Sequence, residues 1–154
     1  MSVENAKEYL KEYNLDKEIS YHEKSTATVA EAAQRIGCTE GEIAKTMAYM
    51  APIGPIVIVM AGDVKLSNRK YRDVFKKKAA MIKIDELEDI IGHPLGGVCP
   101  FGVKEDVKIY LDESLKAYKI VYIAAGSELA TLGIEVKKLE EILPQAKYID
   151  VSQK

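Results

Sequence analysis

Two short apolar segments in the first half of the chain constrain its fold more than any other feature. Residues 46–50 and 56–60 are apolar and strand-forming, and Pro52, Gly54 and Pro55 lie between them. Two strands joined by so few residues pair most simply as antiparallel neighbours. The chain is therefore expected to build a β-sheet around this pair.

Helix-capping patterns stand directly before the strand pair. Thr28 and Glu31 form a capping-box pattern that opens the helix AEAAQRI, and Gly37 ends it. Thr39 and Glu42 repeat the pattern, which predicts a second short helix over EIAK. Helices and strands therefore alternate within short distances along this part of the chain.

The rest of the chain continues this mixture. The further expected elements are helices at 2–13, at 67–78 with an inner face of Tyr71, Val74 and Phe75, at 85–91 capped by Asp85 and Glu88, and at 138–143, and strands at 19–22, 81–84, 107–111, 120–124, 132–136 and 148–151. The order is not a strict βαβ alternation. It indicates one α/β (α+β) domain over residues 1–154, with a curved, mixed, largely antiparallel sheet surrounded by short helices.

Size and charge limit the class of function. A chain of 154 residues can bury roughly 68–70% of its unfolded surface, which is enough for one core without disulfides. Hydrophobic residues make up 47% and the formal net charge is −2. This composition argues against disorder and against a broad grip on duplex nucleic acid, which needs a basic excess.

Cysteine, histidine and apolar runs exclude further classes. Cys38 and Cys99 make no disulfide framework, and with only His22 and His93 there is no zinc-site spacing, so no metal and no cofactor is expected. The N-terminus is polar, and the apolar run 55–61 is too short to span a bilayer. We expect a cytoplasmic protein with no membrane partner.

The loop GHPLGGVCPFG, residues 92–102, is the first segment that can carry chemistry. Its glycines leave the backbone bare, and consecutive N–H groups can form a nest for a phosphate or an oxyanion. It matches neither a P-loop nor a dinucleotide-binding turn. A rigid connection between a helix and a strand remains the alternative.

Other candidate residues each have a plain structural alternative. Lys45 lies among apolar residues and either extends to water or points into a cleft, where it would suit a phosphate. His22 is a general-base candidate without partners for a catalytic triad, and Cys99 more simply packs inertly. The small residues of YIAAGSE, residues 122–128, permit close approach of a ligand or form a tight turn, with Ser127 as the polar group.

The order of these segments is more specific than any one of them. From Tyr21 to Val151, the succession AEAAQRIG, EIAKT, apolar strands, GGVCPFG and YIAAG resembles the YbaK/EbsC family, the aminoacyl-tRNA synthetase-associated domain. This domain also occurs as the editing insertion of bacterial prolyl-tRNA synthetases. The resemblance is carried chiefly by Lys45-Thr46 and by the GxxxP loop that begins at Gly96.

The resemblance implies a freestanding trans-editing deacylase. Such enzymes hydrolyse the ester between a wrong amino acid and the terminal adenosine of tRNA, most often tRNA-Pro carrying cysteine or another small amino acid. The implied partners are the 3′ acceptor end of the mischarged tRNA and an aminoacyl-tRNA synthetase. It also implies that the substrate's ribose hydroxyl or the amino-acid side chain assists.

The same resemblance assigns roles to individual residues. The implied catalytic positions are Lys45, which holds the tRNA 3′ end, and Gly96, Gly97 and Pro100 of the loop. The implied substrate-binding positions are Tyr21, Thr46, Val98, Cys99, Ala125, Gly126 and Ser127.

Two departures from the family pattern affect the choice of substrate. The position of Cys99 is often serine or proline in relatives, and no histidine follows His93, although alanine-specific members carry a late one. Cysteine therefore fits better than alanine. The alternatives are a non-hydrolytic module that binds a tRNA end or nucleotide, and a synthetase-associated module that docks through residues 2–13.

One stretch concentrates positive charge. Eight basic and two acidic residues lie between Asp63 and Lys83, a local net charge of +6 in a chain of net charge −2. Arg69, Lys70, Arg72, Lys76 and Lys77 are therefore candidates for contact with the acceptor stem. A solvated helix face explains the same residues equally well.

Overall fold

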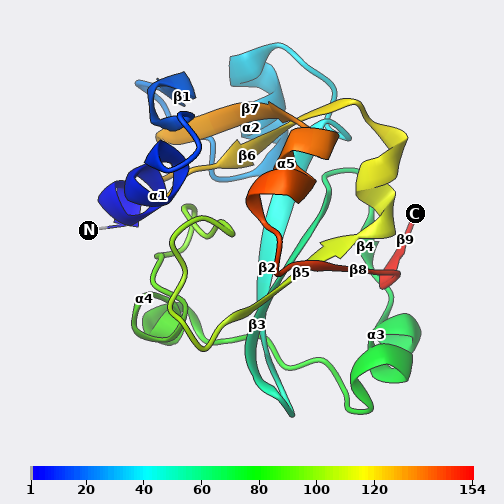
Figure 1. Cartoon of the computed structure of the whole chain (residues 1–154). Helices are drawn as coiled ribbons and strands as arrows, with labels where there is room; N and C mark the ends of the chain where they lie inside the picture. The colour runs from blue at the N-terminus through cyan, green and yellow to red at the C-terminus, as the bar shows by residue number, and fades with distance from the viewer. Residues whose placement is uncertain (1) are drawn as a thin grey trace.

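The computed structural model describes residues 2–154, which form one α/β domain (Figure 1). The α-helices are α1 (Ser2–Lys11), α2 (Val29–Ile36), α3 (Asn68–Phe75), α4 (Leu87–Ile90) and α5 (Val136–Ile142). The strands are β1 (Ile19–Tyr21), β2 (Ile43–Ala51), β3 (Gly54–Ala61), β4 (Lys65–Leu66), β5 (Lys108–Asp112), β6 (Ile120–Ala124), β7 (Ala130–Glu135), β8 (Lys147–Ile149) and β9 (Ser152–Gln153). Three 3-10 helices are η1 (Asp16–Glu18), η2 (Ile84–Glu86) and η3 (Glu113–Ala117).

Seven of these strands form one mixed sheet in the order β1-β7-β6-β2-β3-β5-β8. The expected strand pair is confirmed, and β2 and β3 are antiparallel over eight residue pairs from Ala44–Ala61 to Ala51–Gly54. The expectation of a largely antiparallel sheet needs correction, because three of the six pairings (β2–β6, β3–β5 and β5–β8) are parallel. Each parallel pairing joins strands that are distant in sequence, which turn signals do not reveal. β4 and β9 form a separate pair.

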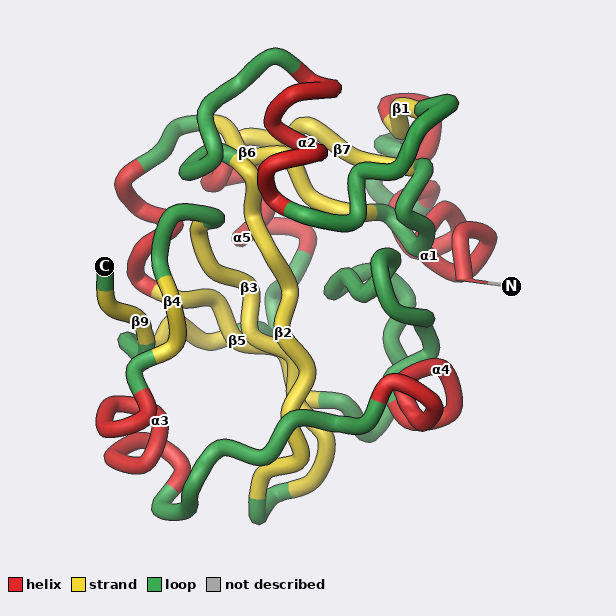
Figure 2. Tube along the Cα trace, turned by 180° about the vertical axis from the view of Figure 1, so that it is seen from behind, coloured by secondary structure: helices red, strands yellow, loops and turns green. Residues whose placement is uncertain are grey.

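Helices cover both faces of the sheet. α1 and α5 lie in front of it in Figure 1, and α2 lies in front in the reverse view of Figure 2. Ala6 and Leu10 of α1 and Leu139 of α5 belong to the largest hydrophobic cluster, whereas Ala32 and Ala33 of α2 pack with a separate small cluster. β3 lies at the centre, with residues 56–61 fully buried. The face under α2 is therefore thinly packed, which leaves room for a cavity.

The first capping box is confirmed in full. The side chain of Thr28 accepts from Glu31 N, and the Glu31 carboxylate accepts from Thr28 N. Gly37 ends the helix with φ +82°, a left-handed conformation that suits glycine. The second helix is wrong. Thr39 and Glu42 make the same reciprocal hydrogen bonds, but they close only a turn. β2 begins at the next residue, because pairing with β3 and β6 outweighs the local helix signal.

Three smaller expectations are also wrong. Val74 is 39% exposed, because α3 ends at Phe75 and buries only Tyr71 and Phe75. The strand at 81–84 is reduced to a single bridge between Met81 and Tyr49. The helix at 85–91 is split into η2 and α4, and neither has a side-chain cap. No helix among residues 2–154 is long and apolar enough to cross a membrane.

Candidate active site

A cavity of about 270 Å³ lies between α2, β2 and the glycine-rich loop 92–102. The loop contributes Leu95, Gly96 and Val98, and β2 contributes five consecutive residues that include Lys45 and Thr46. The remaining lining residues are Thr26, Ala27, Thr28, Val29, Ala32, Ile36, Tyr122, Ala124 and Thr131. Lys45 is the one charged side chain in this lining. An apolar cavity with one cation and several hydroxyl groups suits a small, partly anionic ligand.

Lys45 lies within β2, opposite Met60 of β3, and not at the end of a helix as expected. Its ammonium group donates a hydrogen bond to the backbone carbonyl of Val64. Burial lowers the pKa of Lys45, and the negative charge of Asp63 partly opposes this. A neutral carbonyl uses one of the three N–H donors and leaves the charge and two donors for a ligand.

Thr46 supplies an unpartnered polar atom to the same cavity. Its hydroxyl oxygen is buried and finds no hydrogen-bond partner among residues 2–154. A buried hydroxyl without a partner costs about 1–3 kcal/mol. A ligand atom that bonds to this hydroxyl would recover that cost.

The glycine-rich loop and the small-residue stretch are in direct contact. A Cβ atom on Gly97 would lie 2.4 Å from the carbonyl carbon of Gly126 and 2.6 Å from the nitrogen of Ser127. Only glycine permits this approach. The structure therefore brings together two of the segments that sequence reasoning selected separately.

Gly96 and Gly97 differ in what they offer to a ligand. Gly97 N–H donates to the carbonyl of Pro94 at 3.0 Å and is thus occupied. Gly96, with φ +86°, and Val98 both line the cavity. Within residues 2–154, neither N–H group of this second pair finds an acceptor. The nest expected in this loop is therefore reduced to Gly96 and Val98.

His93 holds the loop together. The carbonyl of Phe101 can only accept, so His93 Nε2 donates to it (2.7 Å), and His93 Nδ1 is left to accept from the hydroxyl of Ser2 on α1. His93 is fully buried, and burial lowers its pKa. The two ends of the loop and the first turn of α1 are thus fixed by one neutral imidazole.

Cys99 is placed inside the core and not in the cavity. It is fully buried beside His93 and Phe101, and burial raises the pKa of its thiol to about 12. This geometry matches inert packing and does not support direct contact with substrate.

The stretch 125–127 also faces inward or folds on itself. Ala125 is fully buried, and Gly126 packs against the backbone of Ser2 and Val3. The hydroxyl of Ser127 accepts from the N–H of Leu129. In this structure, these residues support the loop and do not line the cavity.

Tyr21 and His22 diverge, as expected for neighbours on a strand. Tyr21 is 60% exposed and lies outside the cavity lining. His22 Nε2 is 2.8 Å from the hydroxyl oxygen of Thr131, which does line the cavity. His22 therefore touches the site only through Thr131.

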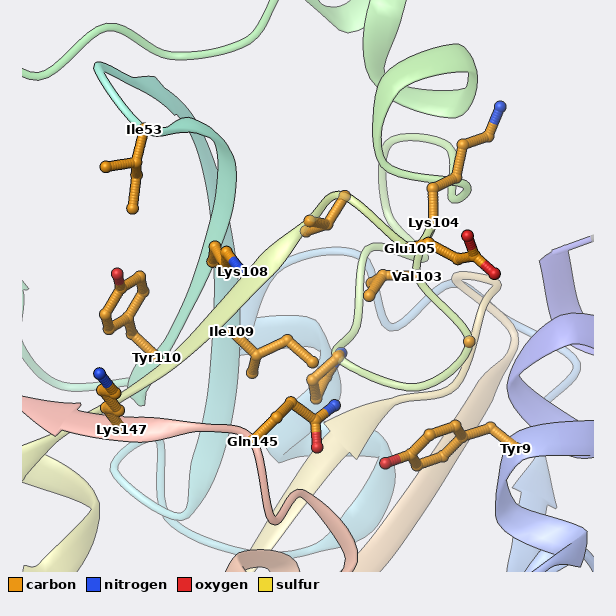
Figure 3. A pocket seen from close by; sticks show the side chains of 13 residues that line it. Tyr9, Ile53, Val103, Lys104, Glu105, Lys108, Ile109, Tyr110, Gln145 and Lys147 are labelled. Atoms are coloured by element: carbon orange, nitrogen blue, oxygen red, sulfur yellow. The ribbon is translucent and has the colours of Figure 1, made fainter.

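Pro100 lies in a different cavity, of about 550 Å³, on the side of the loop that faces α1 and β5. Figure 3 shows Tyr9, Lys108, Tyr110 and Lys147 around it. Pro100 is therefore separated from Gly96 and Val98, although the sequence groups all three in one motif.

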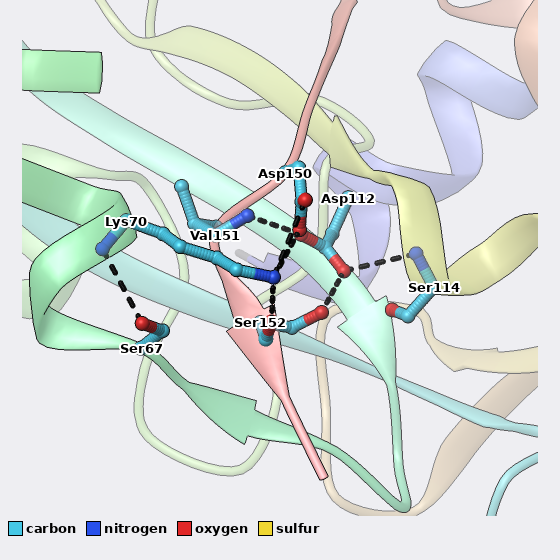
Figure 4. A network of polar contacts seen from close by, with 7 residues as sticks. All are labelled: Ser67, Lys70, Asp112, Ser114, Asp150, Val151 and Ser152. Carbon is cyan, nitrogen blue, oxygen red and sulfur yellow. Dashed lines mark hydrogen bonds and ion pairs between the residues drawn. The ribbon is translucent and has the colours of Figure 1, made fainter. Parts of the chain in front are cut away.

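The basic residues of α3 divide into two groups. Lys70 pairs with Asp150 (3.0 Å) and donates to the carbonyl of Ser152 (2.8 Å), in a network anchored by the fully buried Asp112 (Figure 4). The oxygens of Asp112 accept from Ser114 N, Val151 N and the Ser152 hydroxyl. Lys70 thus fastens the C-terminal segment, whereas Arg69, Arg72, Lys76 and Lys77 are exposed.

Sequence reasoning missed several cavity residues. Thr26, Thr131 and Tyr122 come from three separate segments, and Thr28 was assigned only a capping role. None of them belongs to a recognisable motif. Their shared feature, a hydroxyl group at the cavity, exists only after folding.

The fold and cavity define an α/β domain with a small ligand site that carries one lysine. The profile of the aminoacyl-tRNA editing domain matches residues 23–142, and the chain belongs to this family, which confirms the resemblance to YbaK/EbsC proteins. The chain is 36% identical over 152 residues to the uncharacterized protein YwhH of Bacillus subtilis, covering 98% of this chain and 97% of YwhH. It is 30% identical over 116 residues to the candidate Cys-tRNA(Pro)/Cys-tRNA(Cys) deacylase EbsC of Enterococcus faecalis, covering 74% of this chain and 66% of EbsC.

A solved structure with 25% sequence identity superposes with a TM-score of 0.88. The alignment covers 99% of this chain and 98% of the other, which is described as a candidate trans-editing enzyme for prolyl tRNA synthetase.

Proposed function

We propose that this protein is a trans-editing aminoacyl-tRNA deacylase that acts on tRNA-Pro carrying cysteine or another small amino acid. The observation that carries the proposal is the cavity in which Lys45, the unpartnered Thr46 hydroxyl and the bare loop at Gly96 meet. The family assignment and the description of EbsC support the same substrate class.

The proposed chemistry needs no protein nucleophile. An aminoacyl ester is already activated, so hydrolysis requires a positioned water and donors for the oxyanion that forms. The N–H groups of Gly96 and Val98 are the proposed oxyanion donors, since Gly97 N–H is occupied. Loss of one such donor typically costs about 10²–10³ in rate.

Lys45 is proposed to hold the negatively charged 3′ end of the tRNA. An ammonium on a carbonyl keeps its full charge, whereas one in an ion pair would not. With its side chain half removed from water, its attraction to a phosphate is stronger than at the surface. The tRNA end, and a synthetase that releases it, are thus the proposed partners, and the cytoplasm is the proposed location.

The cavity volume supports a small amino acid. About 270 Å³ must accept the acyl group together with part of the terminal nucleoside. Selection among small side chains is weak, since one methylene is worth about 1–3 kcal/mol. We therefore propose cysteine as the main substrate, with other small residues cleaved more slowly.

The test is a panel of tRNA-Pro charged with cysteine, alanine, serine and proline. We expect Cys-tRNA-Pro to be deacylated fastest, and Lys45→Ala to lower kcat/KM by about 10² or more. Lys138→Ala, an exposed lysine on α5, is the matched control and should behave as the wild type.

Two outcomes would overturn this function. Equal rates for the wild type and Lys45→Ala on every substrate would show that the site is wrong. Tight binding of uncharged tRNA without turnover of any ester would favour a non-hydrolytic module that binds the tRNA end.

A further inference from the structure

The turn that joins β3 to β4 is held more firmly than a surface turn needs to be. A Cβ atom on Gly62 would lie 2.2 Å from the carbonyl oxygen of Glu40 and 2.6 Å from that of Ile43. The turn therefore packs directly against the backbone that leads into β2. Lys45 lies two residues further along that strand.

Asp63, in the same turn, has its own clamp. The hydroxyl of Tyr118, at the end of η3, donates to Asp63 Oδ2 at 2.8 Å. A Cβ atom on Gly41 would lie 1.8 Å from the Tyr118 hydroxyl oxygen and 2.9 Å from Asp63 Oδ2. Gly41 thus leaves the space in which this hydrogen bond forms.

The clamp ends at the lysine of the proposed active site. Val64 follows Asp63 directly, and its carbonyl accepts the hydrogen bond from the Lys45 ammonium. Asp63 acts on Lys45 through space, without an ion pair between them within residues 2–154. The lysine is therefore oriented by a neutral group and keeps a negative charge close by.

We propose that Asp63 and Tyr118 are a positioning pair for Lys45. Tyr118 holds the Asp63 carboxylate, which fixes the turn and the Val64 carbonyl that orients the ammonium. The Asp63 charge keeps that ammonium protonated in a partly buried cavity. The inference rests on the proposed function, because it gives the pair a role in binding the anionic tRNA end.

The charges around Lys45 favour Asp63 for this task. Burial lowers the pKa of Lys45, and Asp63 is the charged group that opposes the effect. Glu42, just before β2, acts on Tyr118, and Lys154 approaches Asp63 at 3.9 Å from an exposed position. Met60, opposite Lys45 on β3, is uncharged. On α2, which packs against β2, the charged residues Glu31 and Arg35 stand at the first and last turns.

Two conservative variants separate the parts of the pair. Asp63→Asn keeps an oxygen that accepts from Tyr118 and removes only the charge. Tyr118→Phe keeps the ring and removes only the hydroxyl. The matched controls are Glu140→Gln and Tyr148→Phe, which alter a similar tyrosine–carboxylate hydrogen bond on α5 and β8.

The first measurement is the titration of Lys45 by NMR on protein labelled with ¹³C-lysine, assigned with Lys45→Arg. We expect Asp63→Asn to lower the pKa of Lys45 by about 0.5 to 1. The Glu140→Gln control should leave it unchanged. An unchanged Lys45 titration in folded Asp63→Asn would overturn the proposal, whether or not the protein deacylates tRNA.

The second measurement is kcat/KM against pH on the best substrate of the panel. Asp63→Asn should move the alkaline limb to lower pH, and Tyr118→Phe should lower kcat/KM about threefold to tenfold at neutral pH, mainly through KM. Tyr148→Phe should match the wild type. Wild-type profiles and rates for both variants would overturn the positioning role. A shifted titration with no deacylation by the wild type would instead refute the proposed function and keep the effect of Asp63 on Lys45.

Discussion

His93 and Phe101 are joined by a hydrogen bond of 2.7 Å from the imidazole Nε2 to the backbone carbonyl. The two residues stand at opposite ends of the loop that lines the candidate active site. The other imidazole nitrogen accepts from the Ser2 hydroxyl. A single buried side chain thus determines the shape of the loop and its contact with α1.

This arrangement predicts that acid destabilises the protein through His93. Burial lowers the pKa of His93 in the folded state, whereas an unfolded histidine titrates near about 6.5. The unfolded chain therefore binds the proton first, and the free energy of unfolding should fall as pH drops below about 6.5. Calorimetric Tm values between pH 8 and pH 5 measure this effect.

The control variants separate His93 from other titrating groups. His93→Gln should have a lower Tm at pH 8 and a flatter dependence on pH, while His22→Gln should keep the wild-type dependence. An equally steep acid loss in His93→Gln would contradict the prediction.

The contact between Gly97 and Gly126 predicts a large effect of one added methyl group. In Gly97→Ala the new Cβ would meet backbone atoms at 2.4 to 2.6 Å, which cannot move aside like a flexible side chain. We expect a loss of about 1–3 kcal/mol in the free energy of unfolding, measured in urea, and a displaced loop. Gly37→Ala, which meets no atom within 4 Å, should show only the cost of its left-handed backbone, about 1 kcal/mol. Equal losses in both variants would refute the steric explanation.

Thr46 predicts opposite effects on stability and activity. Thr46→Val removes a buried hydroxyl that has no partner within residues 2–154, so the free energy of unfolding should stay the same or rise by up to about 1–3 kcal/mol. Loss of one hydrogen bond to the substrate should lower kcat/KM by about tenfold. Thr46→Ser keeps the hydroxyl and should retain most activity. A Thr46→Val enzyme that is both destabilised and fully active would contradict this assignment.

The division of the basic residues on α3 predicts different effects of salt. If Lys76 and Lys77 contact the acceptor stem, each should contribute about 0.7–0.9 to the slope of log affinity for tRNA against log salt concentration. Charge reversal of both should flatten that slope. Lys70→Ala should instead lower Tm, because Lys70 is held by Asp150 and Ser152. A slope unchanged by the double reversal would assign these residues to solvation.

Local sequence signals were sufficient wherever the determining interaction is itself local. Thr28, Glu31 and Gly37 specify the ends of α2 through contacts within ten residues, and the structure has those contacts. The pair β2–β3 followed from two apolar segments and a short turn. The same logic failed at Thr39 and Glu42, where strand pairing with distant residues decided the outcome.

The site shows the same boundary between local and distant interactions. Lys45, Thr46, Gly96 and Val98 could be selected from the sequence, and all four line one cavity. Cys99 and Pro100, from the same motif, point elsewhere, because alternate residues of an irregular loop meet different neighbours.

The sequence by itself determined the family, the strand pair and the lysine, since each depends on residue types in a fixed order. Only the tertiary structure decided what surrounds that lysine. The Val64 carbonyl, Asp63 and Tyr118 reach it from separate segments. Their contacts depend on parallel strand pairings and on glycines that let backbones approach, and no local pattern encodes those distances.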